Sequence, residues 1–446
     1  MSDMLSIGLS SLKAYQTALT TVSENIANAG NAGYSRRATD IREVVAPAGI
    51  TTGTTQGMGV VARGLTRAAD VYKTAEVRNA SADLAKTETG ATWLQRIEES
   101  LTGNKVGSQL TTFFNSAKAV AADPASLAPR AAMIEAASSI GASFAATGAS
   151  LDGALADLDK SAEAGATQLN ALAKSLGRVN AGLGRQQNGT SGQAALLDER
   201  DRLLEQMSAI SDVSVMTDTA GRAVVRVGGV AGPVLVQGET AGAITYKRSE
   251  EGVVAYTLHF QGEGSSVFPT GGALAGFAEG AERIAAARSE VGKLATEFAE
   301  GVNAVQAAGE DLDGNPGAPM FEIGDPAYKL KLVLDDPRGI AAAATGAGIR
   351  DNSNLAGLES LRTDGRFEDT IASVTSANAA ALSARKSVAG AQTAMRDSAV
   401  SERAAAVGVN VDEEAVDLIR FQQAYQASSR VIQIARETLN SILEIR

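Results

Sequence analysis

The stretch SENIANAGNAGYSRR, Ser23 to Arg37, joins a helical pattern to a loop rich in asparagine and glycine. Over residues 3–28 the apolar positions are spaced alternately by four and three, with Val22 beside them. The stripe consists of Leu5, Leu9, Leu12, Gln16, Leu19, Ser23 and Ile26. This heptad predicts an amphipathic helix of the coiled-coil type. One such helix cannot bury its own stripe, so a partner is expected.

The far end of the chain, from Asp412 to Ile445, carries the same spacing. Its stripe consists of Leu418, Phe421, Tyr425, Ser428, Ile432, Ala435, Leu439 and Ile442. Val431 and Ile434 widen the apolar surface to a second face, which predicts more than one neighbour. We expect the two ends to be largely disordered in a free subunit and to form an antiparallel coiled-coil pair when copies stack.

The middle of the chain is mostly helical in pattern. Trp93, Ile97 and Leu101 share a face, and Leu274–Val305 carries another long stripe. In ALLDERDRLLEQMSAI, residues 195–210, Asp198 and Arg202 are spaced to form an i,i+4 ion pair. Residues 213–268 differ, because short runs rich in valine alternate with period two between glycine turns, as in strands.

These patterns predict a nested, mainly α multidomain fold: a terminal α-helical coiled-coil pair, a helical-bundle body and a small inserted all-β domain. The expected boundaries are 1–62 with 400–446 for the terminal assembly domain, 63–212 with 270–399 for the body, and 213–269 for the β insert.

Composition excludes several classes of function. The chain of 446 residues has a net charge of −11 and no local basic patch, which argues against nucleic acid as a partner. It has no cysteine, so disulfides and cysteine-ligated metals are excluded. No apolar run approaches the length of a membrane span, and the N-terminus lacks the features of a cleaved secretory signal.

Residues that could carry chemistry are few. His259 is the only histidine and lies on the less apolar face of a predicted strand, which favours a surface residue over a general base. Asp311, Asp313, Asn315 and Glu322 match a calcium loop, but Pro316 stands where the loop requires glycine. An ordinary turn is the preferred interpretation. We therefore predict no enzyme activity, catalytic residue, metal site or cofactor.

The two ends resemble those of bacterial flagellar axial proteins: ENIANAGNAGYSRR follows a heptad helix, and VGVNVDEEAVDLIRFQQAYQASSRVIQIARETLNSIL ends the chain. Within that family, Gly-Tyr-Ser-Arg at residues 33–36, LLDERDRLLEQMS and GGALAGF make the chain similar to the hook-associated proteins of the first hook–filament junction. Longer relatives carry a further β-rich domain after the Met320-Phe321 turn. Only about thirty residues, 322–351, stand there in this chain.

The resemblance implies a structural subunit of the flagellum, exported without a cleaved signal peptide to the cell exterior, whose terminal helices form the assembly interfaces. The expected N-terminal interface is Leu5, Leu9, Leu12, Leu19, Val22, Asn25, Ile26, Asn28, Gly33, Tyr34 and Arg36. The expected C-terminal interface, which is also the expected site for an export chaperone, is Asn410, Glu413, Leu418, Phe421, Tyr425, Ile432, Leu439 and Ile442. The other implied partners are the hook protein, the second junction protein and further copies of the chain in a ring, with no nucleic acid or membrane.

Three alternatives remain open on the sequence. A rod or hook subunit would share the ends but have a predominantly β middle. A secreted wall-cutting hydrolase would need a pair of carboxylates in a cleft. A cytosolic coiled-coil scaffold would have no role in motility.

Overall fold

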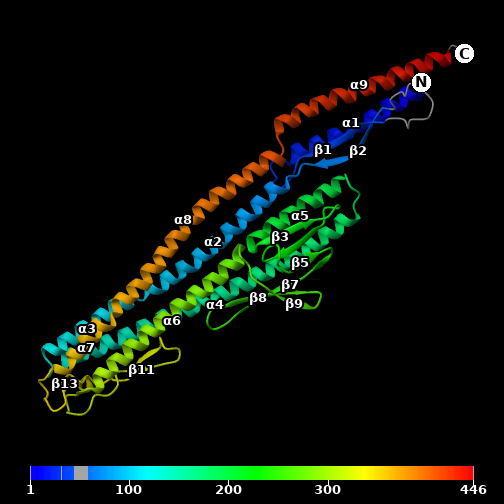
Figure 1. Cartoon of the computed structure of the whole chain (residues 1–446). Helices are drawn as coiled ribbons and strands as arrows, with labels where there is room; N and C mark the ends of the chain where they lie inside the picture. Colours follow the sequence, from blue (N-terminus) through cyan, green and yellow to red (C-terminus); the bar gives the residue numbers. More distant parts are fainter. Residues whose placement is uncertain (1, 32, 45–58, 445–446) are drawn as a thin grey trace.

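The computed structural model describes residues 2–31, 33–44 and 59–444. The molecule is long and narrow, and the first and last helices lie side by side at one end of it (Figure 1). The helices are α1 Ser2–Asn28, α2 Val71–Gly103, α3 Val106–Ala122, α4 Leu127–Arg185, α5 Ser191–Ile210, α6 Gly272–Ala307, α7 Ala356–Gly365, α8 Phe367–Val407 and α9 Val411–Glu444, with single 3₁₀ turns at Pro337–Gly339 and Ser353–Leu355.

The strands form small antiparallel sheets. The ribbon β1–β2 lies beside α1, the insert between α5 and α6 holds the sheets β3-β4-β5-β6 and β7-β8-β9, and two short pairs, β10–β13 and β11–β12, follow α6. Their bounds are β1 Arg37–Glu43, β2 Val60–Arg67, β3 Val213–Thr217, β4 Ala223–Val227, β5 Val234–Gln237, β6 Thr240–Ala241, β7 Ala243–Arg248, β8 Val254–Phe260, β9 Glu263–Val267, β10 Gly309–Glu310, β11 Phe321–Ile323, β12 Leu330–Leu332 and β13 Ala343–Ala344. The predicted class, mainly α with an inserted β region, is confirmed.

The body is a bundle in which α2 packs against α6 and α8, and α4 against α3, α5 and α6. Its core at the end away from α1 and α9 is an aromatic cluster around Phe298, whose ring lies 5.2 Å from Phe113 and 5.7 Å from Phe367. The buried Arg130 guanidinium binds the segment after α6 by donating to the Ile340 carbonyl at 2.6 Å. This end of the body is therefore rigidly packed.

The β insert is held to α4 by three polar residues on that helix. Asn180 accepts from the N–H of Ala223 on β4 and donates to the carbonyl of the same residue, both at 2.8 Å. Asn170 makes the same pair of hydrogen bonds with Ile244 on β7, at 2.7 and 2.9 Å. Asp159 accepts two bonds from Arg248, each of 2.8 Å. Side chains thus replace the missing neighbour strand, which fixes both sheets against the body.

The predicted alternation of the insert is confirmed in β8. Tyr256 and Leu258 are buried, whereas Ala255 and His259 are exposed. His259 is therefore a surface residue on the outer face of the strand. The period of two reflects one face packed on the helices and the other in solvent.

The residues of the calcium-like loop have other roles. Asp311 accepts from the backbone N–H groups of Asp313 and Asn315 at 2.8 and 2.9 Å, as in an Asx turn. The Asp313 carboxylate pairs with Arg338, and Glu322 lies on β11. Among the described residues no group of three or more histidine or acidic side chains is arranged to hold a metal ion.

The predicted domain boundaries remain predictions. The chain leaves the β1–β2 ribbon at residues 68–70 and breaks between α8 and α9 at residues 408–410, close to the boundaries proposed at 62 and 400. Residues 322–351 contain only β11 in part, β12, a 3₁₀ turn and β13. Within the described part of the chain no helix is long and apolar enough for a bilayer span.

Candidate assembly site at the base of the terminal helix pair

Helices α1 and α9 form an antiparallel pair. A Cβ built on Gly8 would lie 2.6 Å from Ile432, the rings of Tyr15 and Phe421 lie 6.4 Å apart, and the Asn25 amide donates to Glu414 at 2.9 Å. As the number on α1 rises, the number of its partner on α9 falls, which defines opposite directions. The two ends therefore pair in the predicted antiparallel sense, but within a single chain, whereas the prediction placed this pairing at the stacking of copies.

The face of α1 that meets α9 differs from the predicted one. The contacts and burial follow Gly8, Tyr15, Ala18, Val22 and Asn25, each one residue before a predicted seam position. One residue turns the face by about 100°. The expectation that the leucine stripe forms the seam is wrong, because Ile432 and Phe421 of α9 lie against Gly8 and Tyr15 instead.

The leucine stripe is consequently left at the side of the pair. Leu5, Leu12, Leu19 and Ile26 are half-buried, and Leu9 is 52% exposed. On α9 the predicted stripe does face α1: Leu418, Phe421, Tyr425 and Ile432 are half-buried and Ala435 is buried, whereas Leu439 is 37% exposed. The side chain of Ile442 lies outside the described residues.

The outer faces of the pair carry further apolar side chains. Val416 is 66% exposed, and Ile419 and Ile434 are each 56% exposed. Lys13 is the only charged residue between Met4 and Ser23. A helix pair with so few charges on α1 and with apolar side chains left partly or fully in solvent is typical of a surface that another chain covers.

The base of the pair is organised by Asn25, which is 1% exposed. Its amide donates to the Arg37 carbonyl at 2.8 Å and to the Glu414 carboxylate at 2.9 Å. Its carbonyl oxygen accepts from the Arg37 N–H at 3.1 Å and from the Tyr34 hydroxyl at 2.9 Å. All the hydrogen-bonding capacity of this buried amide is used, so it fixes the loop, α1 and α9 in one arrangement.

Arg36 neutralises the buried carboxylate of Glu414, which has 0% exposure. Its Nε donates to Glu414 at 2.6 Å, and an Nη lies 3.3 Å from Asp417. The hydrogen bond to Glu414 raises the pKa of Arg36. The predicted residues Asn25, Tyr34 and Arg36 therefore meet: Tyr34 binds Asn25, and Asn25 and Arg36 share the partner Glu414, which the sequence analysis missed.

Tyr34 lies beside the Arg37 guanidinium at the base of the helix pair. The Arg37 guanidinium stands 4.7 Å from the centre of its ring, and burial raises the pKa of the Tyr34 hydroxyl. Gly33 beside it has φ +88°, a left-handed conformation that glycine adopts without strain. The loop thus turns back at Gly33 so that Tyr34 can reach Asn25.

The remaining polar residues of the predicted interfaces, Asn28, Asn410 and Glu413, lie at the ends of helices α1 and α9. Asn28 donates to the Glu24 carbonyl at 2.8 Å and accepts from Asn31 at 2.7 Å, which closes α1. Asn410 accepts from the Asp412 N–H at 3.1 Å and contacts Glu413 at 3.4 Å, which begins α9. These contacts are local caps within one chain.

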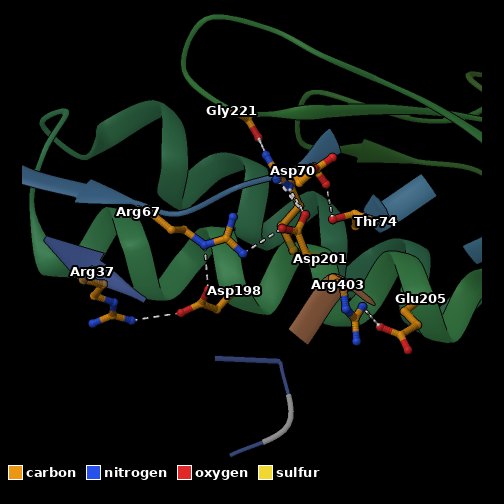
Figure 2. Close-up of polar contacts among 10 residues, drawn as sticks. Arg37, Arg67, Asp70, Thr74, Asp198, Asp201, Glu205, Gly221 and Arg403 are labelled. Carbon is orange, nitrogen blue, oxygen red and sulfur yellow. Dashed lines mark hydrogen bonds and ion pairs between the residues drawn. The ribbon is translucent and has the colours of Figure 1, made fainter. Parts of the chain in front are cut away.

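A second cluster joins the terminal part of the chain to α5 (Figure 2). Asp198 accepts from Arg37 at 3.0 Å and from Arg67 at 2.7 Å. Arg67 also donates to Asp201 at 2.8 Å, and Arg403 of α8 pairs with Glu205 at 2.7 Å.

The predicted Asp198–Arg202 pair is wrong, because Asp198 faces the ribbon and Arg202 binds Glu199 at 2.8 Å. No local signal could reveal these partners, which are 131 to 198 residues apart in sequence.

A cleft of about 720 Å³ lies beside this cluster. It is lined by loop residues 29–31 and 33–35, by α2, by α5 and by the end of α8, so it sits between the terminal part and the body. Its walls combine alanine and valine side chains with charges that already have partners, such as Arg67 and Arg403.

The fold and this site define a class: mainly helical subunits whose two chain ends form one antiparallel helix pair fixed to a helical body. The model of the flagellar hook-associated protein FlgK helical domain matches residues 94–321, just over half of the chain, and the C-terminal model of the flagellar basal body rod FlgEFG proteins matches residues 401–445. The chain belongs to the FlgK family of flagellar hook-associated proteins.

The chain is also similar to individual proteins over their length or part of it. Flagellar hook-associated protein 1 of Salmonella typhimurium is 29% identical over 341 residues, 73% of this chain and 60% of that protein, so the chain spans about three fifths of that relative. The protein of the same name from Escherichia coli K12 is 24% identical over 555 residues with full coverage of both chains. The solved structure of the hook junction protein FlgK from Burkholderia pseudomallei has a TM-score of 0.48 and 22% identity, covering 56% of this chain and 46% of that one.

Proposed function

We propose that the chain is a structural subunit that forms the junction between hook and filament of the bacterial flagellum. It assembles through α1 and α9 after export. Membership of the FlgK family supports the place in the flagellum. The half-buried leucine stripe of an almost uncharged α1, with Leu9 exposed, and the exposed Val416, Ile419 and Ile434 of α9 are the structural observation that supports the mode of assembly.

Burial of these faces supplies the driving force. Each Å² of apolar surface removed from water contributes about 25 cal/mol, so the half-buried leucines of α1 and the outer valine and isoleucine residues of α9 are stabilised when copies pack. Several neighbours are required, because the exposed side chains lie on more than one face of the pair. Self-association in a ring meets that requirement.

The other partners follow from the same surfaces. One end of the ring would contact the hook protein and the other the second junction protein. An export chaperone would cover α9 before assembly, because an exposed apolar helix is an aggregation hazard. The location is extracellular, as part of the flagellum, with export that does not use a cleaved signal peptide.

We propose a structural role and not an enzymatic one. The carboxylates of the candidate site are neutralised by arginines at 2.6–3.0 Å and hold two parts of the chain together. A hydrolase would need a carboxylate pair free to exchange protons with a substrate. The alternative of a rod or hook subunit is disfavoured, because the matched body is helical.

Deletion of the gene tests the proposal. We expect cells with hooks but without filaments, and flagellin released into the medium. A complementing copy of the full chain should restore filaments, whereas a copy without residues 411–446 should not. Filaments in the deletion strain, or restoration by the copy without α9, would contradict the proposal.

A further inference from the structure

The turn between α4 and α5 contains the only Asn-Gly pair in the sequence, Asn188-Gly189. In such a pair the backbone nitrogen of the glycine can attack the side-chain carbonyl carbon of the asparagine, because glycine has no Cβ to hinder the approach. The Asn188 side chain is exposed, so water reaches the reacting groups. The sequence by itself therefore predicts spontaneous deamidation in this turn.

The reaction changes the backbone as well as the side chain. The Gly189 nitrogen loses its proton and forms a bond to Asn188 Cγ. The Cγ–Nδ2 bond then breaks, and the amide group takes up a proton and leaves as ammonia. Water opens the resulting cyclic succinimide at either carbonyl carbon. One product is aspartate, and the other is isoaspartate, in which the backbone runs through the side-chain carbon.

In the folded chain one side chain holds both reacting groups. The Gly189 N–H donates to Gln193 Oε1 at 2.8 Å, and Gln193 Nε2 donates to Asn188 Oδ1, also at 2.8 Å. Because a backbone N–H can only donate, the first contact fixes which end of the Gln193 amide faces Gly189. Gln193 lies in the first turn of α5, where its own N–H donates to the Thr190 hydroxyl at 3.2 Å.

This arrangement opposes the attack geometrically. The new bond to Asn188 Cγ must form in the plane of the peptide, along the direction in which the Gly189 N–H bond points. Gln193 Oε1 occupies that direction and shields the proton from base. The second hydrogen bond polarises the Asn188 carbonyl, but it also holds that carbonyl on the Gln193 amide. Polarisation has no effect while the nitrogen has no path to the carbon.

We propose that Asn188-Gly189 is a deamidation site and that Gln193 is the positioning residue that protects it in the folded chain. Gln193 acts by holding the Gly189 N–H and the Asn188 side chain apart from each other. The protection is a property of the subunit by itself and does not depend on the proposed function.

The site lies where the body meets the β1–β2 ribbon. The Gly189 carbonyl accepts from the Leu65 N–H at 2.7 Å. A Cβ on Gly64 would lie 2.9 Å from that oxygen, and a Cβ on Gly189 would lie 3.3 Å from Gly64 Cα, so the two backbones leave no room between them. Isoaspartate at position 188 adds a methylene group to the backbone directly before Gly189 and displaces this carbonyl. The modification should therefore release the ribbon from the turn.

Mass spectrometry of aged protein tests the protection. The parent chain and Gln193→Ala are incubated in mildly alkaline buffer, both folded and in denaturant, and the peptide that contains residues 188–189 is analysed for deamidation. In denaturant both chains should react at the same rate, because the Asn-Gly pair is the same. In the folded state Gln193→Ala should react faster, by about two- to tenfold for each hydrogen bond that it loses.

Further variants separate the contact with Gly189 from a general loosening of the turn. Gln193→Glu keeps an acceptor for the Gly189 N–H and should react more slowly than Gln193→Ala. The matched control, Gln187→Ala, removes an exposed amide from the same turn and should react at the parent rate. Hydrogen exchange at the Gly189 N–H gives an independent measurement, since both processes begin with loss of that proton, and it should be slow only where an acceptor remains at position 193.

Equal rates in the folded parent and in folded Gln193→Ala would overturn the proposal. A slower reaction in Gln193→Ala would also overturn it, because Gln193 would then promote the attack. Fluorescence of the buried Trp93 verifies that the body of each variant is folded. In aged Gln193→Ala, slow exchange at the Leu65 N–H of the isoaspartate fraction would contradict the release of the ribbon. None of these measurements involves motility, so this proposal and the proposed function can fail separately.

Discussion

At the scale of single residues, the arrangement of α1, α9 and the loop after α1 depends on the buried carboxylate of Glu414. Glu414 is fully buried at the start of α9, where its carboxylate accepts hydrogen bonds from Arg36 and from the Asn25 amide. It joins the first and last helices at a point that the loop after α1 also reaches.

Glu414→Gln should weaken the base of the helix pair by about 1–3 kcal/mol, because Arg36 loses the nearer of its two charged partners and keeps only Asp417 at 3.3 Å. The substitution keeps the side-chain shape, so packing is little changed. Hydrogen exchange at α1 and the start of α9 measures the effect. The neighbouring exposed Glu413→Gln is the control, and equal protection in the two variants would contradict the prediction.

At the scale of elements, the prediction from sequence succeeded for the two terminal helices by themselves and failed for the orientation of α1. The heptad of α1 identified a helix and an apolar stripe, but an exposed assembly face and an internal seam look the same in one sequence. Gly8 lies in the seam because the Ile432 side chain of α9 occupies the space a larger residue would need, and Ala18 is buried on the same face; such small residues give little hydrophobic signal in a sequence. The β insert was predictable because one face of each sheet packs on helices of the same chain.

The burial along α1 is uneven, which bears on the expected disorder of the free ends. Thr21, Val22 and Asn25 are buried near the base, whereas Met4 and Leu9 are exposed near the tip. Local stability follows burial and hydrogen bonding. We expect amide exchange in a dilute, unassembled chain to be slow around residues 21–25 and fast around residues 4–12. Uniformly fast exchange along α1 would mean that the polar base forms only on assembly.

The attachment of the β insert should depend on pH through Asp159. The hydrogen bonds from Arg248 hold the pKa of Asp159 below its ordinary value of 3.8, so this carboxylate stabilises the folded chain above that pH. The contribution is lost as the pH falls through the lowered pKa.

Asp159→Asn should therefore lower the free energy of unfolding at neutral pH, with a difference from the parent chain that shrinks below pH 3.8. Chemical denaturation at several pH values measures it. The control is Asp157→Asn on the same helix, whose carboxylate is 57% exposed and 3.6 Å from Lys160. A constant difference across the pH range would show that Asp159 acts through packing and not through its charge.

At the scale of the whole molecule, the candidate site is composed of parts that are distant in sequence. The loop residues Tyr34 and Arg36 were predictable because they resemble a family motif. Their partners Glu414, Asp198 and Asp201 were not, because charged residues on a helix are most often solvated and one sequence gives no pairing between segments hundreds of residues apart. The topology brings them together by returning the chain through α8 to the point where it left α1 (Figure 1).

The same topology separates two roles that the terminal helices combine. The inner faces of α1 and α9 determine the structure of one subunit, and the outer faces remain for other subunits. A substitution on an outer face should therefore impair assembly and leave the isolated subunit intact. Leu9→Glu and Ile434→Glu each introduce a charge at an exposed apolar position of the pair. Each charge would be buried without a partner if neighbours pack there, at a cost of several kcal/mol.

Both variants should have the Tm of the parent chain and should fail to restore filaments in a strain that lacks the gene. Val253→Glu is the control, since Val253 is 57% exposed but lies in the β insert, and it should restore filaments fully. If Leu9→Glu and Ile434→Glu also restored filaments, the outer faces would not be interfaces. If instead they lowered Tm, those faces would be needed within the subunit, and the division between inner and outer faces described here would be wrong.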